Sequence, residues 1–128
     1  MKTAFISGHL DLTIDEFNFH YKPMIDSAIE NGDSFVVGDA NGADKMSIYY
    51  LFIEEKVDVT IYHMLEYPRN NVGFKRKGGY KSDIERDSAM TRDSDYDIAW
   101  VRAGRENSGT SRNIKRRNSY LASCEKSS

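Results

Sequence analysis

Three short segments of the chain combine glycine with hydroxyl and carboxylate side chains, the composition of loops that hold a phosphorylated ligand. They are residues 7–9, 38–44 and 104–111. Glycine lets the backbone approach a ligand closely, and the free N–H groups of a helix that starts just beyond a loop attract phosphate. The candidate ligand-binding residues in these segments are Ser7, Gly8, His9, Gly38, Asp39, Asn41, Gly42, Ala43, Asp44, Ser108, Gly109, Thr110 and Ser111.

Three carboxylates in these segments are candidates for acid–base chemistry. Asp39 and Asp44 lie five positions apart around a glycine turn, and Glu106 lies in the third segment. One interpretation is that such a carboxylate accepts a ribose hydroxyl or acts as a general base. The other is that Asp39 stabilises the turn and Asp44 caps the next helix. The sequence leaves both open, so the catalytic residues stay unknown.

Two further polar residues have both a functional and a structural interpretation. Arg86 stands at a predicted helix start, where a cation is unfavourable against the helix dipole. Either an anionic ligand or an ion pair with Asp83 or Glu85 would account for it. His9 either contacts a phosphate or a base, or is simply an exposed loop histidine.

The elements that must position these residues alternate between strand and helix. Apolar runs predict buried strands at residues 2–6, 34–37, 57–62 and 97–101. Capping boxes and helical spacing predict helices after Thr13, over about 43–55, over about 83–91 and from about 110 onward. This order predicts an α/β protein, a three-layer Rossmann-like sandwich with a mostly parallel sheet. Ligands bind beyond the carboxyl ends of such strands, so the three segments should share one rim.

Length and composition set the broad class. The 128 residues predict one domain over 1–122 and a flexible tail over 123–128. No apolar run or leader signal predicts a membrane association, and a single cysteine favours a reducing, cytoplasmic setting. We expect no metal and no cofactor. Residues 101–128 carry seven basic and two acidic side chains, a net charge of +5, whereas the whole chain has a net charge of −2.

In its motifs the chain resembles the SLOG superfamily, a Rossmann-like group that includes the DprA fold, the LOG nucleotide hydrolases and YspA-like proteins. The resemblance extends from about residue 3 to 117. It rests on the segments 6–11 (ISGHLD) and 37–44 (VGDANGAD), on Arg86-Asp87 with Met90, and on Ser108-Gly109-Thr110. It implies a nucleotide pocket in which Arg86, Met90 and Asn113 join the residues named above. It also implies a homodimer or higher homo-oligomer.

The resemblance implies one of two activities, and one residue bears on the choice. In family members that hydrolyse nucleotides, a glutamate follows the Gly-Thr turn after two residues, whereas this chain has Asn113 there. Asparagine can bond a ribose hydroxyl but cannot act as a base. We therefore expect a sensor or sequestering protein for a nucleotide or nucleotide-derived signal. A nucleoside 5′-monophosphate N-glycosidase, using Asp39, Asp44 or Glu106, is the alternative. Single-stranded nucleic acid binding is the third, disfavoured by the net negative charge.

Overall fold

Five parallel strands form one sheet in the computed structural model, which describes residues 1–54 and 57–127. The strands are β1 (Thr3–Ile6), β2 (Ser34–Gly38), β3 (Val59–Met64), β4 (Lys75–Tyr80) and β5 (Tyr96–Ile98). Their order across the sheet is β4-β3-β2-β1-β5, and every pair is parallel. The helices are α1 (Ile14–His20), α2 (Lys22–Glu30), α3 (Ala43–Phe52), α4 (Asp83–Asp93) and α5 (Gly109–Ser127).

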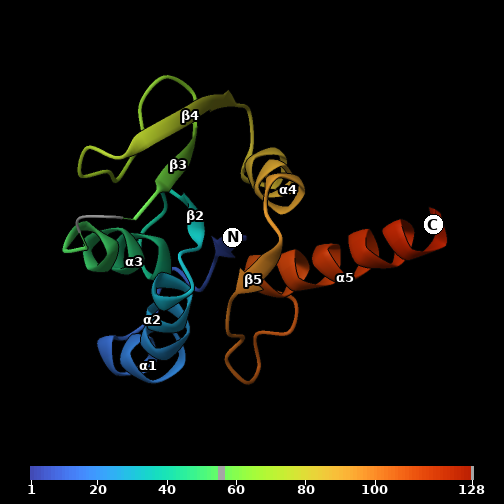
Figure 1. Cartoon of the computed structure of the whole chain (residues 1–128), viewed down its shortest axis with the longest axis horizontal. Helices are drawn as coiled ribbons and strands as arrows, with labels where there is room; N and C mark the ends of the chain where they lie inside the picture. Colours follow the sequence, from blue (N-terminus) through green and yellow to red (C-terminus); the bar gives the residue numbers. More distant parts are fainter. Residues whose placement is uncertain (55–56, 128) are drawn as a thin grey trace.

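Helices cover both faces of this sheet, which confirms the predicted α/β Rossmann-like class. Figure 1 shows α1, α2 and α3 grouped on one side, α4 on the other, and α5 projecting away from the sheet. Successive residues of a strand point to opposite faces of the sheet. Ala4 and Ile6 of β1 pack against α1–α3, and Phe5 between them packs against Ala89 and Met90 of α4.

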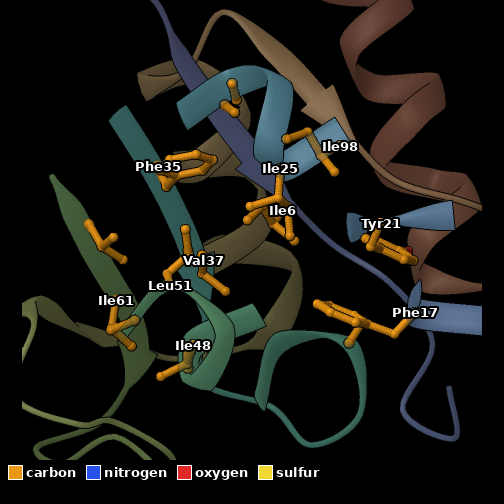
Figure 2. Close-up of a cluster of buried hydrophobic side chains, with 14 of the residues drawn as sticks. Ile6, Phe17, Tyr21, Ile25, Phe35, Val37, Ile48, Leu51, Ile61 and Ile98 are labelled. Carbon is orange, nitrogen blue, oxygen red and sulfur yellow. The ribbon is translucent and has the colours of Figure 1, made fainter. Parts of the chain in front are cut away.

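The larger core lies between the sheet and α1–α3, where Figure 2 shows Ile6, Ile25 and Leu51 pointing toward one another. Tyr21 at the junction of α1 and α2 is fully buried there. Its hydroxyl donates to the Ser7 carbonyl at 2.7 Å and accepts from the Trp100 N–H at 3.1 Å. One side chain therefore joins the loops that follow β1 and β5.

The strand boundaries differ from the predicted ones, and one strand was not predicted at all. The sequence predicts no element between the strand at 57–62 and the helix that starts near residue 83, yet β4 lies there. β4 is an edge strand whose side chains are mostly exposed, so no apolar pattern marks it. Residues 65–74 cross from β3 to β4 without a helix. Val72 and Phe74 from this crossover pack against the larger core.

The last helix is fixed to the body by a buried arginine in its first half. Arg117 donates from Nη1 to the carbonyls of Thr91 and Ser94, at 3.0 and 2.9 Å. Its Nη2 contacts Asp97 at 3.2 Å. These bonds satisfy carbonyls at the C-terminus of α4. The predicted tail over 123–128 overlaps α5, whose helical backbone continues to Ser127, and residue 128 lies outside the described residues.

Candidate functional site

A cavity of about 570 Å³ opens at the carboxyl end of the sheet, where the loops after β1 and β5 meet. β1 has β2 on one side and β5 on the other. From β1 the chain runs to the helices of one face, and from β5 it runs to α5. Chain connections that leave adjacent strands in opposite directions open a crevice between their loops, which is where ligands bind in open parallel sheets.

The structure brings most of the candidate residues to this cavity and places the rest beside it. Those that line it are Ser7, Gly8, His9, Asp44, Arg86, Met90, Ser108, Gly109, Thr110 and Asn113. Those that do not line it are Gly38, Asp39, Asn41, Gly42, Ala43, Ser111 and Glu106. The second segment thus contributes mainly Asp44 to the wall, while its glycines shape the turn. Glu106 accepts the Gly104 N–H within its own loop.

One wall of the cavity is basic and is built from the start of α5. Gly109 and Thr110 lie on it at the helix N-terminus, where backbone N–H groups are free. Arg112 and Arg116 also line it. Their recorded partners are neutral oxygens, the Asn107 carbonyl at 2.7 Å and Asn113 Oδ1 at 2.6 Å. Within the described part of the chain, neither arginine has a carboxylate within 4.0 Å.

A second part of the cavity wall is acidic and is organised around Arg86 of α4. This arginine is buried, with 5% of its surface exposed. Its Nη1 donates to Asp39 Oδ1 at 2.9 Å, and its Nε and Nη2 donate to Asp87 Oδ1 at 3.2 and 3.0 Å. Asp83 lies 3.3 Å from Nη1. These ion pairs explain how a cation is stable at a helix start.

Asp39 is fully engaged by arginines and is closed to a ligand. Its Oδ2 accepts from the Arg69 backbone N–H at 2.8 Å and from Arg69 Nε at 3.2 Å. Its Oδ1 accepts from Arg69 Nη2 and from Arg86 Nη1, each at 2.9 Å. Burial raises the pKa of Asp39, but the bonds and charge of Arg69 outweigh burial and hold that pKa below its usual value. Asp39 therefore positions two arginines rather than a substrate.

Asp44 is buried at the cavity wall and keeps one oxygen without a donor. Its Oδ2 accepts the Ala40 N–H at 3.2 Å. Burial raises the pKa of Asp44 to about 7, the neighbouring Arg86 opposes this rise, and Asp87 and Asp39 add to it. Gly38 makes room for this arrangement, because a Cβ there would lie 2.7 Å from Asp44 Oδ2. A carboxyl that exchanges its proton near neutral pH is suited to acid–base chemistry.

Two residues of the first loop have well-defined surroundings. Ser7 is 6% exposed, and its hydroxyl is buried with no hydrogen-bond partner. His9 is buried, unlike the exposed loop histidine of the structural interpretation, and its Nε2 accepts the Arg102 N–H at 2.9 Å. Burial, then the charges of Arg102 and Arg105, lower the pKa of His9. His9 is thus a neutral group that ties the β1 loop to the β5 loop.

Several charged residues on the cavity were not among the candidate site residues. Asp11 and Asp87 belong to the motifs of the family resemblance, whereas the others had no predicted role in the site: Arg69, Asp83, Arg105, Arg112 and Arg116. Arg69 comes from the crossover between β3 and β4, and the length of that segment without a predicted element was its signal. The spacing of Arg112 and Arg116, four apart after Gly109, was the signal for the basic wall.

Comparisons with protein-family models, curated proteins and solved structures found no match for this chain. In the part of the chain that the structure describes, no group of three or more His, Cys, Asp or Glu side chains is arranged to hold a metal ion. No helix among the described residues is long and apolar enough to cross a membrane.

Proposed function

We propose that this cavity binds a nucleotide or a nucleotide-derived signalling ligand, of the ADP-ribose, NAD-derived or cyclic-nucleotide class, in a sensor or sequestering protein. The proposal stands on the basic wall. Gly109 and Thr110 at the start of α5, and two arginines that pair with no carboxylate among the described residues, line one cavity. Such a wall is stabilised by a phosphate, which is the anion that helix N-termini bind best. The order of the motifs supports membership of the SLOG superfamily as part of the same proposal.

Ser7 lines the cavity, and its buried hydroxyl has no hydrogen-bond partner among the described residues. A buried hydroxyl without a partner costs free energy, so a small adjustment of this loop that turned the hydroxyl toward a ligand would be favourable. Apolar side chains complete the lining, with Phe5 and Met90 each 1% exposed. Basic, acidic and apolar side chains on one cavity fit the phosphate, ribose and base of a nucleotide.

The test is isothermal titration calorimetry with AMP, GMP, CMP, UMP, ADP-ribose, NAD⁺ and cyclic dinucleotides. We expect at least one of them to bind, and Arg116→Gln to weaken that binding about 10- to 100-fold, since a hydrogen bond to a charged group contributes roughly 1.5–3 kcal/mol. Lys115→Gln is the matched control, because Lys115 lies on the same helix but does not line the cavity. Absence of binding by every compound would contradict the proposal.

A second function, N-glycosidic hydrolysis of a nucleotide, is favoured by Asp44. Its pKa near 7 allows it to take a proton from an attacking water, or to give one to the departing base. Release of free base, lost in Asp44→Asn, would support this activity. Intact nucleotide after prolonged incubation at high protein concentration would reject it and leave binding alone.

A further inference from the structure

We propose that the acidic wall selects a ribose, so that the ligand is a ribonucleotide whose vicinal 2′- and 3′-hydroxyls donate to Asp44 and Asp87. This inference rests on the proposed function and assigns the part of the cavity lined by Asp44 and Asp87.

Among the described residues, each of the two carboxylates has a protein donor at one oxygen and none at the other. Asp44 accepts the Ala40 N–H at Oδ2, which leaves Oδ1 open. Asp87 accepts both bonds from Arg86 at Oδ1, which leaves Oδ2 open. Both residues line the cavity. Two carboxylates with one open oxygen each can accept two hydroxyl donors of one ligand.

The other carboxylates near the cavity do not have this property. Both oxygens of Asp39 are filled by arginine donors. Asp11 is bonded by Arg102 at Oδ1 and by Arg105 at Oδ2. The side chain of Asp83 is 59% exposed, so bulk water solvates its carboxylate. Asp87, by contrast, has a side chain that is only 15% exposed, and Asp44 is 7% exposed.

Arg86 already supplies a cation to the acidic wall through its bonds to Asp39 and Asp87. It also lies close to Asp44, since a Cβ placed on Gly38 would be 2.7 Å from Asp44 Oδ2 and 3.0 Å from Arg86 Cζ. A neutral hydroxyl donor can therefore bond the open carboxylate oxygens without placing a second cation beside the guanidinium. Ser7, whose buried hydroxyl has no partner among the described residues, lines the same cavity.

The experiment compares AMP, GMP, CMP and UMP with their 2′-deoxy counterparts by calorimetry on the full chain. At about pH 8, above the Asp44 pKa of about 7, we expect the ribonucleotide that binds best to bind about 10- to 100-fold more tightly than its 2′-deoxy form, since loss of the 2′-hydroxyl leaves a carboxylate oxygen without its donor. In Asp87→Asn and Asp44→Asn the ratio should fall toward one, because an amide presents a donor where the carboxylate presented an acceptor. The ratio is measured on one protein sample, so a partly unfolded fraction cancels.

Asp83→Asn is the control for charge. It removes one negative charge at the same cavity, so we expect it to shift both affinities together and leave their ratio unchanged. Equal binding of ribo- and deoxyribonucleotides by the unmodified chain would overturn this inference while leaving nucleotide binding intact. An unchanged ratio in both Asp44→Asn and Asp87→Asn would also overturn it. If no nucleotide binds, the proposed function fails and this inference fails with it.

Discussion

At the scale of single residues, Asp44 makes the stability of the fold depend on pH. Its carboxyl is buried between the Ala40 N–H and Arg86, with Asp39 and Asp87 nearby, and its pKa is raised to about 7. The unfolded chain releases this proton near pH 4, so between pH 4 and 7 the folded state holds a proton that the unfolded state has lost. The contribution of Asp44 to stability therefore falls as pH rises through this window.

Asp44→Asn should remove this pH dependence. An amide has the shape of the protonated acid and does not ionise. We expect the free energy of unfolding of the variant, relative to the unmodified chain, to rise by about 4 kcal/mol between pH 4 and 7, at 1.36 kcal/mol for each unit of pKa shift. Urea unfolding at half-unit pH steps measures it.

Asp58→Asn is a control in which the effect of pH on stability has the opposite sign. Lys75 bonds this exposed carboxylate and lowers its pKa, so its favourable contribution is lost as pH falls. We expect only a small effect there, confined to acid pH. A difference between Asp44→Asn and the unmodified chain that stays constant from pH 4 to 7 would contradict the assignment of Asp44.

At the scale of elements, the turn before α3 positions the β1 loop. Gly42 has φ +73°, and a Cβ there would lie 2.3 Å from the His9 carbonyl oxygen and 2.4 Å from that of Leu10. The same His9 carbonyl accepts the N–H of Ala43 at 3.1 Å. The glycine of the second segment thus serves the approach of two loops rather than contact with a ligand.

Gly42→Ala should destabilise the fold by more than about 3 kcal/mol, because left-handed strain adds to a backbone clash. Gly104→Ala is the matched control. Gly104 has φ +88° but open space around it, so only the strain of about 1–2 kcal/mol applies. Denaturant unfolding of both variants separates the cost of the backbone clash from the cost of the left-handed strain. If both variants lost the same free energy of unfolding, the clash at Gly42 would contribute nothing and this prediction would be contradicted.

Elements with an apolar pattern were predictable from the sequence, and those without one were not. Phe35, Val36 and Val37 are buried on both faces of β2, and such a continuous run predicts a strand. β4 carries Lys75, Arg76 and Lys77 at an exposed edge, where burial imposes no pattern. Arg69 reaches the cavity only because the crossover before β4 passes near Asp39, a tertiary fact that local spacing does not encode.

At the scale of the whole molecule, the basic C-terminal segment is not one continuous surface. Arg117 is buried against α4, and Arg112 and Arg116 face the cavity. The body of the chain is acidic. A groove for single-stranded nucleic acid needs a continuous basic path with stacking aromatic side chains. The placement of these arginines instead favours a small anion.

We therefore expect no complex with single-stranded DNA or RNA in a gel shift at low ionic strength, where electrostatic binding is strongest. Arg112→Gln and Lys115→Gln should both leave this result unchanged. A shifted band that weakens steeply as salt is added, and that Lys115→Gln reduces, would contradict this expectation.

The cavity unites residues from opposite ends of the chain, and this has a consequence for how the protein is made. Ser7 directly follows the first strand, and Gly109 begins the last helix, about 100 residues later. At roughly 5–20 residues per second of synthesis, several seconds separate their appearance at the ribosome. All five strands and the larger core are synthesised before α5. A nascent chain can therefore fold this core while its cavity still lacks the basic wall. The proposed ligand would then recognise only the finished protein and would select it over every earlier intermediate.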